Sequence, residues 1–298
     1  MIGEVGTVAV ASHLDLAAAL TAAGQRVDAL IVDAPYSTVT HAGHDAGVAA
    51  APRMLDFAGR GGGAAKDRTY AARKAARGET HRRAIDYPAW AASDVEAFVD
   101  AWAPLTSGWF VSITDDELAH TWKAELRNAG LYVFAPIPLI ETGGRVRLRG
   151  DGPSSWACWV IVARPMSGEW LSEWMQSRRS STLRGLHEGN DDLDSVPAYY
   201  RQASEEKDVV GGKPLRAMKS IVADYSLPGQ VVCDPCCGGG PALVAAKMSG
   251  RRWIGGDCDA AHVEIARKRL DETTPCDARG TPIGGAKGKS EAFNWGDE

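Results

Sequence analysis

The sequence predicts an α/β fold built on a doubly wound, mostly parallel sheet. Strand and helix patterns alternate along most of the 298 residues, which is typical of such sheets. The run VDALIVD at residues 27–33 is apolar almost throughout, as expected for a parallel strand covered on both faces. This run ends in a carboxylate, Asp33, and a second apolar run, at residues 231–234, ends in Asp234. Both would lie at the sheet edge where ligands bind.

Each element of the first half follows from its residue pattern. Residues 6–12 alternate weakly, which indicates a short strand, and residues 14–23 are rich in alanine and leucine, which predicts a helix ended by Gly24. Further on, the patterns predict a helix over 93–102 with Ser93 as its N-cap, a strand over 108–114, a helix over 115–130 with an acidic first turn, and strands over 131–140 and 156–165.

Regularity fails in the middle of the chain and then returns. Residues 166–210 are polar, of mixed charge and studded with tryptophan and tyrosine, which favours an inserted segment or small subdomain. Residues 211–272 then show helix, strand, glycine-rich turn, helix, strand, acidic residue and helix. We expect residues 46–85 to form a mobile loop with a basic helix, and residues 273–298 a flexible tail.

Composition narrows the class of protein. The net charge of -5 argues against a uniformly basic nucleic-acid binder, although a basic cleft stays compatible with it. No apolar run approaches the ~20 residues that a membrane helix needs, and no secretory signal pattern stands at the N-terminus. The six cysteines look like reduced thiols rather than a disulfide framework. We therefore expect a cytoplasmic protein without a membrane partner.

The stretch VVCDPCCGGG has the physics of a cofactor pocket. A buried strand ends at Asp234, and the glycines that follow let the backbone pass close to a ligand. A second carboxylate, Asp257, ends the next strand, where ribose hydroxyls are commonly bound. A dinucleotide is the obvious competitor, but the glycines do not fit G-x-G-x-x-G and Asp234 would repel a pyrophosphate. S-adenosylmethionine carries an ammonium and a sulfonium and no phosphate, so electrostatics favours it.

Zinc is the alternative interpretation of the cysteines in this stretch. Cys233, Cys236 and Cys237 have a partial ligand spacing, but no second Cys or His pair stands at a suitable distance. His41, His44 and Asp45 have a spacing that one helical turn could bring onto a metal, and we favour a role in a binding pocket or in loop order instead. We therefore expect no metal site, and Cys236 and Cys237 as small apolar fillers.

Four motifs together resemble the amino-group DNA methyltransferases. DAPYS (33–37) resembles the family's D-P-P-Y motif, and DPCCGGG (234–240) resembles its D-P-F-x-G-S-G cofactor loop. GGKPLRAM (211–218) is similar to the Lys-Pro segment that precedes that loop, and RRWIGGDCD (251–259) to the G-R-x-x-I-G-x-E run. The order, with the catalytic motif before the cofactor loop, is that of the permuted β group. The resemblance therefore implies a Rossmann-like methyltransferase sheet with an inserted target-recognition segment.

The resemblance implies a chemical role for each part of the DAPY motif. An exocyclic amino nitrogen is a poor nucleophile, because its lone pair is delocalised into the base. Asp33 and the main-chain carbonyl of Ala34 would accept its two hydrogens and free that lone pair, with Pro35 holding the backbone. The base must leave the duplex, and Tyr36 would stack on it, which is worth about 1–3 kcal/mol. The implied cofactor residues are Ser12, Lys213, Pro214, Asp234, Pro235, Cys236, Cys237, Gly238, Gly240 and Asp257.

Several positions depart from the family pattern. Ala34 stands in place of the family's first proline, Gly239 in place of the usual serine, and Pro241 where threonine is common. Asp257 is one methylene shorter than the more frequent glutamate, and Ser12 stands where an aspartate is often found. These changes bear on cofactor affinity more than on the fold.

Positive charge is concentrated in a few segments, as an acidic protein that acts on DNA requires. Arginines crowd residues 68–83, and Arg145, Arg147 and Arg149 share one side of any extended segment. A solvated helical face is the alternative for the first group. The expected DNA contacts are Ser37, His41, Arg68, Arg82, Arg83, Arg145, Arg147 and Arg149.

The prediction from sequence is an S-adenosylmethionine-dependent DNA methyltransferase that methylates a flipped adenine. Residues 1–165 would form its catalytic half, 166–210 its target-recognition segment and 211–272 its cofactor half. Cytosine is the alternative base, because adenine rests only on the Asp-initiated motif. Methylation of a protein glutamine or of RNA, a dehydrogenase reaction, and DNA binding by a relative that has lost its cofactor also stay open. The partner is double-stranded DNA, in a bacterial or phage-infected cell; a homodimer and a restriction-enzyme partner stay open.

Overall fold

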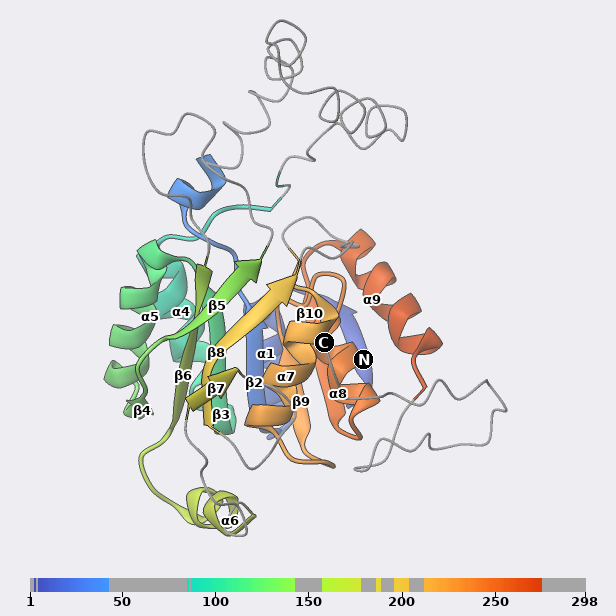
Figure 1. The fold of residues 1–298 in the computed structure, drawn as a ribbon. Helices are drawn as coiled ribbons and strands as arrows, with labels where there is room; N and C mark the ends of the chain where they lie inside the picture. The colour runs from blue at the N-terminus through green and yellow to red at the C-terminus, as the bar shows by residue number, and fades with distance from the viewer. Residues whose placement is uncertain are drawn as a thin grey trace, which may run out of the picture.

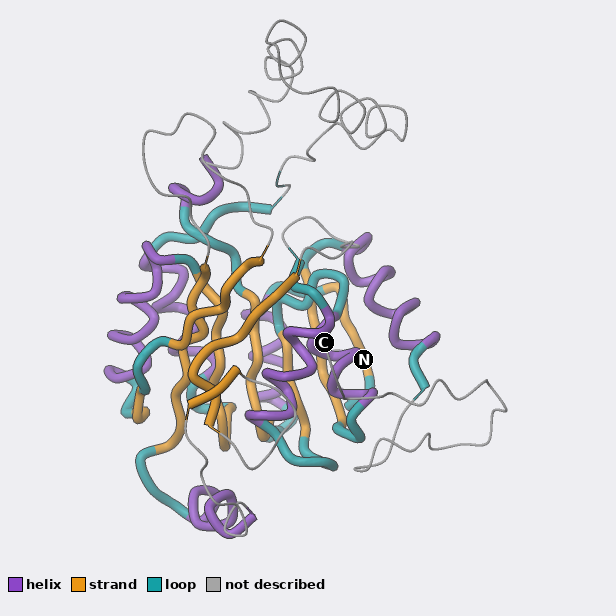
Figure 2. The backbone as a smooth tube through the Cα atoms, viewed as in Figure 1, coloured by secondary structure: helices purple, strands orange, loops and turns teal. Residues whose placement is uncertain are grey.

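The computed structural model describes residues 3, 5–42, 85, 87–142, 157–177, 186–188, 196–203 and 212–274. Figure 1 shows a central sheet with helices on both faces, and Figure 2 shows the same arrangement by secondary structure. The predicted α/β class is confirmed. Every helix in this part of the chain falls short of the length and apolar character that crossing a bilayer requires.

Ten strands of the described residues form the sheet, in the order β1-β10-β9-β2-β3-β6-β5-β8-β7, with β4 beside β6. Strands β1, β10, β9, β2 and β3 pair in parallel, whereas β6 is antiparallel to β3 and β5. Their bounds are Thr7–Val10 (β1), Val27–Asp33 (β2), Thr106–Thr114 (β3), Leu131–Val133 (β4), Ile137–Thr142 (β5), Ala157–Pro165 (β6), Leu186–Glu188 (β7), Val196–Ala203 (β8), Val231–Asp234 (β9) and Arg252–Asp257 (β10).

The helices cover the sheet from two sides. Helices α1, α4 and α5 pack on one face around Leu16, Phe98 and Trp122, and α6, α7 and α8 pack on the other around Trp174 and Met218. Helix α9 packs against α8 and β1 at the edge (Figure 1). The bounds are His13–Ala22 (α1), Ala92–Trp102 (α4), Asp116–Asn128 (α5), Glu169–Ser177 (α6), Leu215–Tyr225 (α7), Pro241–Met248 (α8) and Ala260–Glu272 (α9).

The strand order reverses between β9 and β2. From β9 the chain continues through α8 on one face to β10, whereas from β2 it continues through α4 on the other face to β3. When the connections from two neighbouring parallel strands run over opposite faces of the sheet, a crevice forms next to the carboxyl ends of those strands. The apolar run of β2 and the end of β9 therefore meet at the sheet's switch point.

Two sequence expectations need correction. Helix α4 begins after Ala91, not at Ser93, because the Asp94 carboxylate accepts the Ala91 N–H at 2.7 Å and so satisfies the helix start. The single strand expected over 131–140 is two strands, β4 and β5, both paired with β6. Pro136 lies between them and has no N–H for the ladder.

The described parts of residues 166–210 contact the core, and their expected role as an inserted segment stays a prediction. Strand β8 extends the central sheet by pairing in parallel with β5, and both Tyr200 and Trp174 are buried. The Tyr200 hydroxyl donates to Asp224 of α7 at 2.8 Å. The expected loop over 46–85 and the expected tail lie almost wholly outside the described residues.

Candidate active site

Three carboxylates end three neighbouring parallel strands. Asp33 ends β2, Asp234 ends β9 and Asp257 ends β10. The register pairs Leu30 with Cys233 and Gly255 with Asp234, so the three strand ends lie at the same edge of the sheet. The structure therefore brings together two motifs that stand about 200 residues apart in the sequence.

Lys213 lies against the catalytic motif. Its ammonium donates to both oxygens of Asp33, at 2.7 and 2.9 Å, and both side chains are largely buried. The same ammonium lies 4.7 Å from the centre of the Tyr36 ring, and the Tyr36 hydroxyl lies 3.4 Å from Asp33. The sequence motifs place Lys213 with the cofactor and Asp33 with the base, whereas the structure makes them partners.

Burial and charge act in opposite directions on this cluster. Burial by itself lowers the pKa of Lys213, but the charge and hydrogen bonds of Asp33, together with Cys158 and Tyr87, outweigh it, so the pKa is raised and the ammonium stays charged. Burial raises the pKa of Tyr36 well above its usual value, and the nearby Cys158 and Asp33 add to this effect. Tyr36 is therefore a neutral ring with a hydroxyl donor, which suits stacking and not proton abstraction.

The loop after Tyr36 is held by groups from two other elements. Trp90 donates its N–H to the Tyr36 carbonyl at 2.9 Å. Asp115, the N-cap of α5, accepts the Ser37 N–H at 2.9 Å and the hydroxyls of Ser37 and Thr40 at 2.5 and 2.6 Å. Ser37 is buried and its hydroxyl is engaged with Asp115, and its expected contact with DNA stays a prediction. Ala34 is buried in the first core cluster.

The glycine loop is shaped by its backbone. Gly238 and Gly240 have φ angles of 50° and 74°, a region that favours glycine. A Cβ at Gly240 would lie 2.9 Å from the Cβ of Ala266, so the loop also needs the missing side chain for its contact with α9. Gly240 caps α8, and Pro241 stands at the first helical position, which proline favours. The proline that departs from the family pattern therefore fits this local structure.

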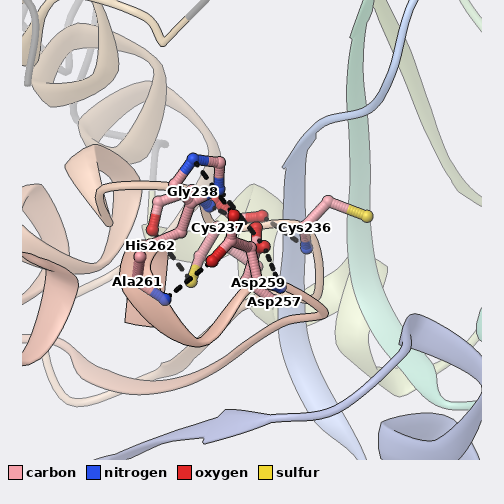
Figure 3. A network of polar contacts seen from close by, with 8 residues as sticks. Cys236, Cys237, Gly238, Asp257, Asp259, Ala261 and His262 are labelled. Carbon is pink, nitrogen blue, oxygen red and sulfur yellow. Dashed lines mark hydrogen bonds and ion pairs between the residues drawn. The ribbon is translucent and has the colours of Figure 1, made fainter. Parts of the chain in front are cut away.

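Asp257 organises the loop from below, as Figure 3 shows. Its carboxylate accepts the N–H of Gly238 at 2.8 Å and that of Asp259 at 2.9 Å. The His262 imidazole lies 3.4 Å from the same carboxylate. Cys237 donates its N–H to the Gly256 carbonyl at 2.9 Å. The predicted ribose-binding carboxylate is thus held in place by the loop itself.

Asp234 lies deepest in the site, with only 1% of its surface exposed. It accepts the Cys236 N–H at 3.2 Å. Burial raises its pKa well above 3.8; the hydrogen bond from Cys236 opposes this rise, and the charges of Asp33 and Asp257 add to it. A cationic ligand beside Asp234 would therefore favour the charged form of this carboxylate.

Cys233 of β9 and Cys237 of the loop are buried, and Cys236 is partly buried. Burial raises the pKa of Cys233, Cys236 and Cys237 well above the usual thiol value, which keeps them protonated. In Figure 3 the Cys236 side chain points away from the Asp257 network. Among the described residues, no group of three or more His, Cys, Asp or Glu side chains could hold a metal ion.

The remaining predicted residues are placed as follows. Ser12 caps α1 by accepting the Asp15 N–H at 3.1 Å, directly after the end of β1 and so beside Asp257. Pro214 is buried at the start of α7, and Pro235 is buried between Asp234 and the glycines. His41 packs edge-on against Tyr87, and its Nε2 has no hydrogen-bond partner in the described ranges. Outside the described residues lie Arg68, Arg82, Arg83, Arg145, Arg147 and Arg149.

Three residues that the sequence motifs do not include support the site. The residue pattern presents Asp115 only as an acid at a helix start, and His262 only as part of a helix. Arg269 of α9 donates to the Gly239 carbonyl at 2.7 Å and so supports the loop where the family's serine is missing. A polar residue directly after a predicted strand was the available signal for Asp115; none pointed to Arg269.

Fold and site together define a class of α/β protein with a ligand crevice at the switch point of a parallel sheet. A model of the DNA methylase family N6_N4_Mtase matches residues 101–268, which is more than half of the chain. The chain therefore belongs to this family of amino-group DNA methyltransferases.

Sequence relatives match over short stretches. The chain is 42% identical over 75 residues to the type II methyltransferase M.EcaI of Enterobacter cloacae, covering 24% of this chain and 17% of that protein. It is 39% identical over 59 residues to the type II methyltransferase M2.DpnII of Streptococcus pneumoniae, covering 20% of this chain and 22% of that protein. The chain thus spans about a fifth of the length of the curated relatives it matches.

Solved structures are similar in fold over much longer stretches. The M1.HpyAVI–SAM complex has a TM-score of 0.56 at 15% identity, over 88% of this chain and 98% of that one. TTHA0409 of Thermus thermophilus, complexed with S-adenosyl-L-methionine, has a TM-score of 0.54 at 14% identity, over 90% and 93%. PvuII DNA methyltransferase, which is cytosine-N4-specific, has a TM-score of 0.53 at 10% identity, over 89% and 86%.

Proposed function

We propose that the protein is a DNA methyltransferase of the permuted β group that transfers a methyl group to the exocyclic amino nitrogen of a flipped adenine. The observation that carries this proposal is the position of Asp33 and Tyr36. They lie at the carboxyl end of β2, beside the glycine loop that follows β9. Family membership supports the reaction class, and the Asp-initiated motif favours adenine.

The residues at the neighbouring strand ends suit S-adenosylmethionine. Three carboxylates, one of them with a raised pKa, offer a negative site to a ligand that carries a sulfonium and an ammonium. Asp257 would face the ribose hydroxyls, and Lys213 would offer a counter-charge to the ligand's carboxylate. The bound cofactor would supply an electrophilic methyl group on sulfur. A dinucleotide fits less well, because the same carboxylates would repel its pyrophosphate.

Asp33 would hold the target nitrogen. One carboxylate oxygen accepts a hydrogen bond from the amino group, and the carbonyl of Ala34 accepts the other hydrogen, which localises the lone pair for attack. As the new N–C bond forms, the methyl–sulfur bond would break and leave a neutral thioether, and the nitrogen would shed one proton, which the Asp33 carboxylate would receive. Because Lys213 binds both Asp33 oxygens, the target amino group must share these oxygens with the ammonium or displace it.

The other parts of the proposal concern DNA. Residues 166–210 would supply target recognition, and the arginines outside the described ranges would bind phosphates, together with His41 near the base pocket. Methylation of cytosine is the alternative, since the fold is shared with a cytosine-N4-specific enzyme. A homodimer and a restriction-enzyme partner are likewise proposals.

Nucleoside analysis tests the proposed function. Purified protein is incubated with tritiated S-adenosylmethionine and unmethylated genomic DNA, and the DNA is digested and examined by mass spectrometry. We expect N6-methyladenine from the wild type and none from Asp33→Ala, with Asp116→Asn as an active control of equal charge change. N4-methylcytosine would select the alternative base. No transfer, together with no cofactor binding by calorimetry, would leave only a non-catalytic DNA-binding relative.

A further inference from the structure

Asp115 connects the start of α5 to the loop that follows the catalytic motif. It is buried, with 7% of its surface exposed. One carboxylate oxygen, Oδ1, accepts the Leu118 N–H at 3.1 Å and so caps the helix. The other, Oδ2, accepts three hydrogen bonds from residues 37–40, which stand 75 to 78 positions earlier in the sequence. A cap needs only the first of these two oxygens.

The second oxygen acts on one particular peptide group. The bond between Tyr36 and Ser37 carries the Tyr36 carbonyl, which accepts from Trp90 N–H at 2.9 Å, and the Ser37 N–H, which donates to Asp115 at 2.9 Å. This peptide is therefore held at both of its polar ends. The orientation of this peptide plane fixes the backbone direction at Tyr36. It therefore also fixes the position of the Tyr36 ring and of the main-chain carbonyls that precede Tyr36.

We propose that Asp115 is a positioning residue for methyl transfer, which orients the Asp33–Tyr36 segment without touching the substrate. The inference rests on the proposed function, because it assigns Asp115 a part in that reaction. Reacting groups must be held within a fraction of an ångström, and a displacement of about 1 Å is enough to lower a rate ~100-fold. A charged, buried acceptor with three loop donors meets that demand better than solvent would.

Asp115→Asn is the sharpest variant, since it has the same shape and asparagine caps helices as well as aspartate does. Its amide group would place an N–H opposite the Ser37 N–H, a donor against a donor. Asp116→Asn is the matched control, because it removes the same charge one residue on. Asp116 accepts a hydrogen bond from Trp159 Nε1, and no hydrogen bond joins it to the loop among the described residues.

We expect Asp115→Asn to lower kcat by about 30- to 100-fold, with KM and Kd for S-adenosylmethionine changed by less than about threefold. Asp116→Asn should leave kcat within about twofold. In a Ser37→Ala/Thr40→Val background, Asp115→Asn should cost much less than it does alone, because the loop donors it serves are already reduced. A purely structural cap would lower the melting temperature and leave kcat per folded molecule unchanged.

Amide hydrogen exchange tests the inference separately from activity. In Asp115→Asn, exchange in the peptide covering residues 34–42 should speed up at least about tenfold, while α7 and β9 exchange as in the wild type. Unchanged exchange, or unchanged kcat in an active protein, overturns the positioning role. If the wild type is inactive but Asp115→Asn still exchanges faster over residues 34–42, the proposed function is refuted. The structural connection between Asp115 and the loop is then still supported.

Discussion

The Lys213 ammonium lies 2.7 and 2.9 Å from the two carboxylate oxygens of Asp33, across 180 residues of sequence. The pair joins the segment before α7 to the end of β2, and it is largely buried, with 6% and 17% of the two side chains exposed. A buried ion pair costs desolvation on both sides, so each partner depends on the other. This dependence can be measured.

Removing one partner should leave the other as an uncompensated buried charge. We expect Lys213→Met to lower the free energy of unfolding by about 3–5 kcal/mol. The double variant Lys213→Met/Asp33→Asn should be more stable than the sum of the two single losses predicts, by at least about 1 kcal/mol. Urea unfolding of the four proteins measures this coupling. Lys247→Met is the control, because Lys247 donates to the Leu270 carbonyl and has no described carboxylate partner. Additive losses for Lys213 and Asp33 would contradict the coupling.

Asp234 should destabilise the cofactor-free protein at neutral pH. Since its folded pKa is raised above 3.8, the folded state binds more protons than the unfolded state does, and stability falls as pH rises from 3.8 through the folded pKa. Asp234→Asn should therefore raise the melting temperature at pH 7 but not below pH 3.8. Thermal unfolding across pH measures the difference. The same variant should bind S-adenosylmethionine at least about tenfold more weakly, a loss of about 1.4 kcal/mol. A pH-independent stability difference would argue against the raised pKa.

Gly240 should not tolerate a side chain. Alanine there meets both the positive φ of 74° and the Ala266 Cβ at 2.9 Å, whereas Gly229 has a φ of 84° with nothing within 4 Å. Gly229→Ala should cost only the backbone strain, about 1–2 kcal/mol. Gly240→Ala should cost more and should also weaken cofactor binding. Chemical unfolding and calorimetry of the two variants compare these costs, and equal costs would show that the contact with α9 is unimportant.

Asp257 should matter for binding more than for stability. Asp257→Ala releases the Gly238 and Asp259 N–H groups and removes the carboxylate proposed to meet the ribose, so we expect at least about a tenfold loss of cofactor affinity. Asp259→Ala is the control, because Asp259 caps α9 through the Ala261 N–H at 2.7 Å. It should cost about 0.5–2 kcal/mol of stability at unchanged affinity. Calorimetry separates the two, and an affinity loss in the control alone would reverse the assignment.

Local sequence predicted the elements well where one physical signal dominated. The apolar run of β2, the alternation of strands with helices and the glycines after Asp234 each depend on neighbours in the chain, and these features are present in the structure. Local sequence failed where a side chain competes for a backbone group. Helix α4 begins after Ala91, because Asp94 accepts the Ala91 N–H. Two strands, β4 and β5, replace the one expected strand, because Pro136 lies between them.

The α/β class, the two motifs and the strand ends that carry them can be predicted from sequence, because they follow from periodicity and from residues within one element. Which distant groups meet becomes clear only in the folded chain: Lys213 with Asp33, Asp115 with Ser37, and Arg269 with Gly239. Such contacts are set by sheet order and register. These in turn depend on how whole faces of strands and helices are buried, and no single stretch of sequence records that.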